Sequence, residues 1–201
     1  MTGDNALDQD QRAFNRRLIE TFERLSVEYA VGGSMAAMLY SETRSTKDID
    51  IMLRVDLSTL EVVVNEIESW QIYIDPFETL FEFVLPGKLP INVIDGSSGL
   101  KADLYVTQPE GLDQSAMSRR RRMQMYREPK FEAWILAPEN VILYKLDYFK
   151  QSDGVSQKHP IDISKMLGVI GNELDTAYLE HWAKEINVLD LWLALWDEFQ
   201  K

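Results

Sequence analysis

Three aspartates are spaced so that their carboxylates could bind a divalent cation together. Asp48 and Asp50 stand two positions apart in Asp48-Ile49-Asp50-Ile51, and Asp103 follows in the alternating stretch that begins at Lys101. On a β-strand, residues i and i+2 share a face, so Asp48 and Asp50 would project together about 7 Å apart along the chain. Two carboxylates on one face repel each other unless a cation lies between them, and oxygen ligands suit Mg²⁺. The pattern predicts a metal site that gains Asp103 if its strand lies beside the first.

A glycine turn precedes the acid pair. Gly32-Gly33-Ser34 follows the apolar residues that end at Val31 and precedes a stretch of helix formers. Free backbone N–H groups and the dipole at a helix N-terminus attract anions, typically phosphate. Alone, such a glycine pair is most often an ordinary tight turn, and an Asp-x-Asp is most often solvated. The combination is more specific, because a triad of acids with a phosphate-binding turn is typical of two-metal phosphoryl transfer.

Hydropathy patterns predict the elements that must position these residues. The predicted helices of the first part cover 8–25, 35–40 and a segment opened by the capping box Ser58-Thr59-Leu60-Glu61, and the predicted strands cover 29–31, 49–53, 71–74, 91–94 and 102–106. In the second part we expect a helix over 112–126, a strand or extended link over 131–136, and helices over 138–149, 162–170 and 175–199. This order predicts an α+β fold with a mixed β-sheet and flanking helices. Residues 1–130 would form the core, and residues 131–201 a C-terminal helical region packed on it.

Composition narrows the function classes. The 201 residues hold 21 Lys and Arg against 33 Asp and Glu, a net charge of −12, which argues against broad binding of duplex DNA. The sequence has no cysteine, which excludes disulfides and Cys-ligated zinc. It has two histidines, so a multi-His metal site is not expected. No apolar run is long enough to span a membrane, and the acidic start Met1–Asp10 does not look like a signal peptide. We therefore expect a cytoplasmic protein without a membrane partner.

The stretch from Val31 to Leu53 resembles the signature of the nucleotidyltransferase fold of the DNA polymerase β superfamily. That signature is a hydrophobic residue, Gly, Gly or Ser, a spacer of about nine to thirteen residues, and Asp-hydrophobic-Asp/Glu-hydrophobic, with a third acid on a later strand. Pro138–Leu146 and Ile161-Asp162-Ile163 extend the likeness to small bacterial nucleotidyltransferase-like proteins related to abortive-infection toxins. The resemblance covers most of the chain after residue 25.

The resemblance implies a transferase that moves an NMP from an NTP such as ATP to a hydroxyl by a two-metal mechanism with Mg²⁺ or Mn²⁺. Asp48 and Asp50 would bind both metals, and Asp103 would bind one and help deprotonate the acceptor. By the same resemblance, Gly33 and Ser34 would hold the nucleotide phosphates. Lys145 would neutralise the charge that develops on the triphosphate, and Asp162 would orient Lys145 or a metal-bound water.

The residues themselves leave alternatives open. Lys145 could instead be a solvated helix residue, and Asp162 could be the N-cap of the helix it opens. Arg44 and Lys47, on the loop before the acid pair, could reach a phosphate or stay in solvent. The run Arg119–Arg122 could receive an RNA end or form a solvated helix face.

The biological role is open at this level too. The acceptor could be an RNA end, a protein hydroxyl or a small molecule. A nucleotide- or protein-binding module without turnover is one alternative, and a toxin of a toxin–antitoxin pair that modifies tRNA is another. An antitoxin or a second copy of the chain would then be a partner.

Overall fold

The computed structural model describes residues 3–41, 46–80 and 89–201, and the chain divides into two compact units. The first unit comprises Met1–Val31 and Thr46–Ile135, and the second comprises Gly32–Ser45 and Leu136–Lys201. The segment around the glycine turn thus groups with the C-terminal helices rather than with the strands that flank it in sequence. The predicted boundary at residue 130 stays a prediction.

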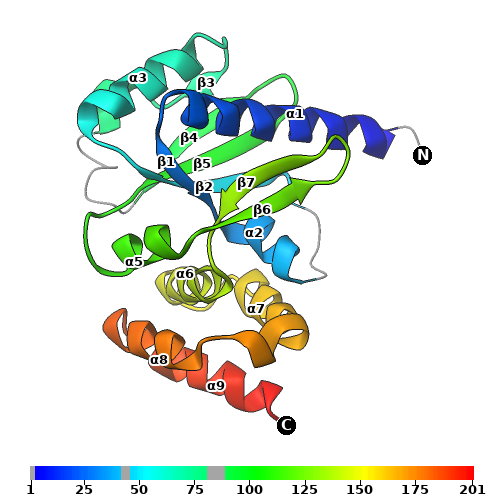
Figure 1. Cartoon of the computed structure of the whole chain (residues 1–201), viewed down its shortest axis with the longest axis vertical. Coiled ribbons are helices and arrows are strands. Elements are labelled where there is room, and N and C mark those ends of the chain that lie inside the picture. Colours follow the sequence, from blue (N-terminus) through cyan, green and yellow to red (C-terminus); the bar gives the residue numbers. More distant parts are fainter. Residues whose placement is uncertain (1–2, 42–45, 81–88) are drawn as a thin grey trace. The chain divides into compact units, whose positions relative to one another are not determined.

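A mixed sheet forms the centre of the first unit (Figure 1). In the described part of the chain its strands follow the order β3-β4-β5-β2-β1-β7-β6. The strands are β1 (Glu28–Val31), β2 (Asp48–Arg54), β3 (Tyr73–Ile74), β4 (Ile91–Asp95), β5 (Leu100–Val106), β6 (Arg121–Tyr126) and β7 (Phe131–Ile135). The pairs β2–β5 and β1–β7 are parallel and the other pairs are antiparallel. The mixed sheet and its flanking helices confirm the predicted fold class.

Two helices cover one face of this sheet. The C-terminal ends of helices α1 (Gly3–Arg24) and α3 (Leu57–Glu68) meet, where Arg24 of α1 pairs with Glu66 of α3 at 2.7 Å. Phe22 of α1 packs on Tyr29 of β1, with ring centroids 6.0 Å apart. The apolar residues Ile49, Ile51 and Leu53 point to this face and are fully buried, each contributing on the order of 1.5–3 kcal/mol. Alternation along β2 therefore sends its acidic residues to the opposite face.

The predicted helix over 112–126 is wrong in its second half. Helix α5 (Gly111–Arg119) ends with the first arginine, and β6 pairs antiparallel with β7 from Arg121 to Tyr126. The stretch Arg-Arg-Met-Gln-Met-Tyr alternates in polarity as a strand does, and pairing with β7 overrides its helix propensity. The arginines therefore do not share a helix.

The capping prediction for α3 also needs correction. The N-cap is Asp56 rather than Ser58, since the Asp56 Oδ1 accepts a hydrogen bond from the backbone N–H of Thr59 at 2.7 Å. The Ser58 hydroxyl donates to the same oxygen at 2.9 Å. These hydrogen bonds lower the pKa of Asp56, with that from Thr59 as the largest cause. The sequence signature was right about the helix and placed its start two residues late.

Helices make up the described part of the second unit: α2 (Gly33–Tyr40), α6 (Pro138–Gln151), α7 (Lys158–Ile170), α8 (Thr176–Glu185) and α9 (Leu189–Phe199). Trp192 is fully buried at its centre. The buried Glu139, next to the first residue of α6, accepts a hydrogen bond from the backbone N–H of Asp175, the N-cap of α8, at 3.1 Å. The predicted helical region is confirmed, with the segment 175–199 split into two helices at Asn187 (φ 59°).

Across the described ranges, every helix is too short or too polar to cross a membrane.

Candidate functional site

The predicted neighbourhood of the acids is confirmed in the sheet of the first unit. Strands β2 and β5 run parallel and adjacent, and Asp50 stands directly opposite Asp103. One step back along both strands, Asp48 stands opposite Lys101. Residues in register on adjacent strands point to the same face, so these four side chains form one cluster on the face opposite Ile49 and Ile51. We call it the acid row.

Lys101 is a member of the acid row that the sequence analysis did not single out. Its Nζ lies 2.9 Å from Oδ1 and 3.2 Å from Oδ2 of Asp103. The hydrogen bond to Asp103 and the negative charges of Asp103, Asp48 and Asp50 outweigh partial burial and raise the pKa of Lys101. Lys101 and Asp103 are two residues apart, as Asp48 and Asp50 are, so the strand pattern already places Lys101 on the same face as Asp103.

The acid row has donors for a metal ion, but not a ready-made cage. In the described ranges no three Asp, Glu or His side chains are grouped closely enough to hold one ion. The donor type nevertheless fits, because the Oδ1 of Asp103 is buried, accepts no hydrogen bond from a described residue, and faces the Lys101 ammonium instead. Carboxylate oxygens are the ligands that Mg²⁺ and Mn²⁺ prefer. A metal site at Asp48, Asp50 and Asp103 therefore stays a prediction.

A fourth carboxylate lies beside the acid row on the next strands. Asn92 of β4 is the register partner of Asp103. Its backbone N–H and its Nδ2 donate to Oδ2 of Asp75 at 2.7 and 2.8 Å, and the Tyr73 hydroxyl donates to Oδ1 at 2.7 Å. Burial opposes ionisation, but these hydrogen bonds and the charge of Lys101 prevail and lower the pKa of Asp75. Asp75 is therefore a further negative charge near Lys101.

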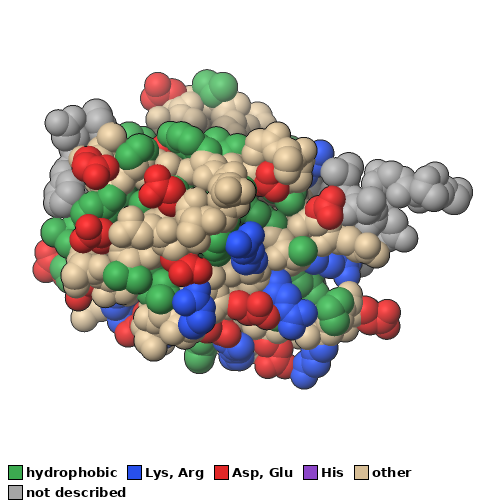
Figure 2. Space-filling view, turned by 90° about the horizontal axis from the view of Figure 1, so that it is seen from above, with side chains coloured by type: hydrophobic (Ala, Val, Ile, Leu, Met, Phe, Trp, Pro, Cys, Tyr) green, Lys and Arg blue, Asp and Glu red, His purple; other side chains and the backbone are tan. Residues whose placement is uncertain are grey.

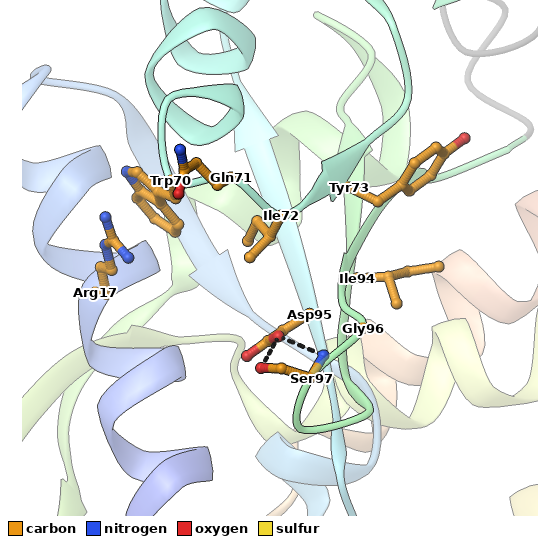
Figure 3. A pocket seen from close by; sticks show the side chains of 9 residues that line it. All are labelled: Arg17, Trp70, Gln71, Ile72, Tyr73, Ile94, Asp95, Gly96 and Ser97. Carbon is orange, nitrogen blue, oxygen red and sulfur yellow. Dashed lines mark hydrogen bonds between the residues drawn. The ribbon is translucent and has the colours of Figure 1, made fainter.

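A hollow of about 610 Å³ opens at the same end of the sheet (Figure 3). One side carries Trp70 with the Arg17 guanidinium 4.0 Å above its ring centre, and the other carries Tyr73 and Ile94. Below them, Asp95 accepts hydrogen bonds from the turn that follows it, and these serine contacts lower its pKa to about 2. The residues that line this hollow include no member of the acid row.

A second polar cluster lies within the second unit, and we call it the lysine cluster. The Lys145 Nζ donates to Oδ2 of Asp162 at 2.8 Å and lies 3.4 Å from the Ser34 hydroxyl, which donates to the same carboxylate at 3.3 Å. The side chains of Lys145 and Asp162 are only 4% and 2% exposed. The alternatives of a solvated Lys145 and an N-cap at Asp162 are therefore wrong, since α7 begins at Lys158 and Asp162 lies inside it.

The glycine turn begins α2 within this second unit. Gly33 has φ 57°, a left-handed conformation that a residue without Cβ adopts at little cost. The carbonyl of Gly32 accepts the hydrogen bond of the Ala36 N–H at 2.9 Å, and no side chain caps the helix. The expected strand–turn–helix sequence is confirmed, and Ser34 stands in the first turn of the helix.

The basic candidates before β2 are placed only in part. Lys47 is exposed and immediately precedes β2, next to Asp48. Arg44 lies outside the described residues. Their contacts with a phosphate stay a prediction.

Two arginines of the run, Arg120 and Arg122, pair with acids elsewhere in the first unit. Arg120 pairs with Glu28 at 3.1 Å, Arg122 pairs with Glu23, and both guanidinium groups lie over Trp134. Glu28 is the register partner of Arg54, the last residue of β2, so these pairs lie roughly 20 Å along the strand from Asp48. On the face shown in Figure 2, basic side chains are interspersed with acidic ones and form no continuous patch.

Solved structures share this fold at low sequence identity. The match to the antibiotic-resistance factor ANT(2″)-Ia covers 91% of this chain and 96% of that protein's chain, with a TM-score of 0.62 at 14% identity. The lincosamide antibiotic adenylyltransferase LnuA, with lincomycin bound, covers 76% and 94%, with a TM-score of 0.52 at 15% identity. An antigenic nucleotidyltransferase-like protein from Paracoccidioides brasiliensis covers 80% and 76%, with a TM-score of 0.51 at 16% identity. No family model and no curated protein matches the sequence. The chain therefore has the nucleotidyltransferase fold of these structures, as the resemblance implied.

Proposed function

We propose that this chain is a metal-dependent nucleotidyltransferase that moves an NMP from an NTP to a hydroxyl. One observation carries the proposal: Asp50 stands opposite Asp103, with Asp48 on the same face, in a chain with the nucleotidyltransferase fold. In the reaction, the acceptor oxygen bonds to the α-phosphorus while the bond from that phosphorus to the α–β bridging oxygen breaks. Pyrophosphate then leaves, and the hydroxyl proton passes to a base.

The acid row would supply the metal ligands and that base. Asp48, Asp50 and Asp103 would hold Mg²⁺ or Mn²⁺, and such ions, when bound, neutralise charge that develops on the phosphates and the leaving group. Asp103, whose Oδ1 lies 2.9 Å from the Lys101 Nζ, is the carboxylate we assign to accept the proton of the acceptor hydroxyl, as the resemblance implies. Asp48 is the exposed member and would meet the ion from the solvent side.

The lysine cluster and the glycine turn would serve the phosphates. The Gly33 and Ser34 amides at the start of α2 suit an anion, and the Ser34 hydroxyl adds a donor. Lys145 would neutralise charge on the triphosphate, and Asp162 would fix its ammonium in place. Lys47 and Arg44 would add a cation from the loop before β2.

For the acceptor, we propose a hydroxyl on a small molecule. ANT(2″)-Ia has been solved in complex with adenylyl-2″-tobramycin, and the match to that structure covers 89% of this chain and 97% of that protein's chain. Two arginines of the run that would bind an RNA end, Arg120 and Arg122, pair with glutamates instead. Labelling of RNA in the experiment below would instead favour a toxin that modifies tRNA.

The test is the Asp50→Asn variant, which keeps the shape of the side chain and removes its charge. We expect transfer of label from α-³²P NTPs to fall at least about a hundredfold, the order seen when one charge-stabilising group is lost. Each NTP is supplied with three acceptor pools: whole-cell RNA, whole-cell protein and small hydroxyl compounds. Asp10→Asn, at an exposed position of α1, is the matched control and should keep full activity.

The outcomes separate the candidates. Full transfer by Asp50→Asn would refute the assignment of the acid row. Binding of Mg²⁺–NTP by calorimetry without pyrophosphate release, across all NTPs and acceptor pools, would favour a binding module without turnover.

A further inference from the structure

Lys101 stands where a cation is expected among the acids. Its ammonium lies within 3.2 Å of both carboxylate oxygens of Asp103. Asp48 is its register partner on β2, and Asp50 is opposite Asp103. Asp75 adds a charge from the far side of β4. One positive charge therefore offsets part of the negative charge of the three acids of the acid row, which would otherwise repel one another.

We propose that Lys101 is a built-in counter-ion, which holds the acid row together without metal and must leave Asp103 before a divalent cation can bind. This inference rests on the metal site of the proposed function. It makes Lys101 a positioning residue that weakens metal affinity, rather than a ligand.

The geometry allows Lys101 to leave. Its side chain is 36% exposed and that of Asp103 is 16% exposed, so the lysine is more open to solvent than its partner. A lysine carries its charge on a flexible four-carbon stem and makes no planar bidentate fork, so its pair with a carboxylate is easily exchanged. Asp103 itself is fixed by β5, which is paired on both sides. On metal binding, therefore, the lysine moves and the acids stay.

The experiment measures binding of Mn²⁺ alone to the full chain, without nucleotide, from the loss of the free Mn²⁺ signal in electron paramagnetic resonance. Lys101→Met removes the charge and keeps the length of the side chain. We expect it to bind Mn²⁺ about fivefold more tightly, the factor that corresponds to loss of one partly exposed ion pair. Lys101→Arg keeps the charge and should bind no more tightly than the native chain.

Lys130→Met is the matched control. Lys130 pairs with Glu132 at 2.8 Å, is 66% exposed and follows β6, so the variant makes the same change of net charge away from the acid row. It should leave Mn²⁺ affinity unchanged. If Lys130→Met tightens binding as much as Lys101→Met does, net charge explains the effect and the proposal is overturned.

Thermal unfolding supplies a second readout. Without metal, Lys101→Met should unfold at a lower temperature than the native chain, because its acids lose their counter-ion. Added Mn²⁺ should raise its unfolding temperature by more than that of the native chain. Unchanged or weaker Mn²⁺ binding by a folded Lys101→Met would overturn the counter-ion role.

Asp103→Asn distinguishes this failure from failure of the proposed function. If Asp103→Asn loses Mn²⁺ binding while Lys101→Met shows no gain, the metal site stands and the role of Lys101 falls. If Asp103→Asn binds Mn²⁺ as the native chain does, or if the native chain binds none at millimolar Mn²⁺, the metal assignment itself falls and the role of Lys101 falls with it.

Discussion

At the scale of single residues, Lys145 and Asp162 form a buried ion pair in the second unit. Both side chains are almost inaccessible, and their 2.8 Å contact satisfies two charges that water cannot reach. Removing one partner leaves the other charge uncompensated. We expect Lys145→Met to lower the free energy of unfolding by about 3–5 kcal/mol, measured by urea denaturation.

A double variant shows whether the uncompensated charge is the cause. Lys145→Met with Asp162→Leu replaces both ions with apolar groups, and we expect it to recover more than half of the lost stability. Equal destabilisation of the single and double variants would mean that packing, not charge, explains the loss. Both variants should lose transfer activity, so stability is the measurement that separates the two explanations.

Sequence periodicity predicted the carboxylates of the site better than its lysines. The common face of Asp48, Asp50 and Asp103 was predictable because alternation on a strand fixes the face of each residue and β2 pairs with β5. Lys145 was left open because a lysine on a helix is usually solvated, and only the partner Asp162, 17 positions away in sequence, decides its burial. Lys101 could not be singled out from the sequence, because a lysine near an acid is common on exposed strands. Only the strand register shows that Asp48 stands opposite it.

At the scale of elements, the start of α2 depends on one glycine. Gly33 holds a positive φ at the first residue of the helix, a conformation that costs a residue with Cβ roughly 1–2 kcal/mol. We expect Gly33→Ala to reduce the free energy of unfolding by about that amount in urea denaturation. If the turn also binds phosphate, NTP affinity should fall more than stability alone would explain.

Gly168→Ala is the control with the opposite sign. Gly168 lies in α7, is exposed, and an added Cβ would meet no atom within 4 Å. There the same substitution should raise the free energy of unfolding by about 0.5–1 kcal/mol, because alanine favours a helix. If Gly168→Ala lowers the free energy of unfolding, or Gly33→Ala raises it, the conformations assigned to these two glycines do not explain their effects.

Element boundaries were less predictable than element types. The helix over 112–126 failed because residues 121–126 carry a pattern that suits both structures, and the choice depends on a partner strand that follows a turn. The two-residue shift at α3 has a similar origin, since Asp56, Ser58 and Thr59 all satisfy the composition of a cap. Local sequence offers several equivalent donors and acceptors there, and backbone geometry selects one.

At the scale of the whole molecule, charge balance controls which polyanions can bind. The net charge of −12 opposes a phosphate backbone, and Glu28 and Glu23 pair with two arginines of the run, Arg120 and Arg122. A protein gains affinity for duplex DNA only from cations that are free to replace counterions. Broad duplex binding is therefore not expected, whereas a nucleotide that meets the acid row through a divalent cation is not subject to the same repulsion.

We therefore expect fluorescence anisotropy with a short labelled duplex to give a dissociation constant weaker than about 0.1 mM at physiological salt. The double variant Glu23→Gln/Glu28→Gln releases three arginines, Arg54, Arg120 and Arg122. Its affinity should rise about fortyfold more than that of the native chain when salt falls from about 200 to 50 mM. Glu61→Gln/Glu68→Gln, at two exposed positions of α3, makes the same change of net charge without releasing an arginine. If both double variants respond equally to salt, net charge alone governs binding; a steeper response of the first shows that the glutamates sequester the arginines.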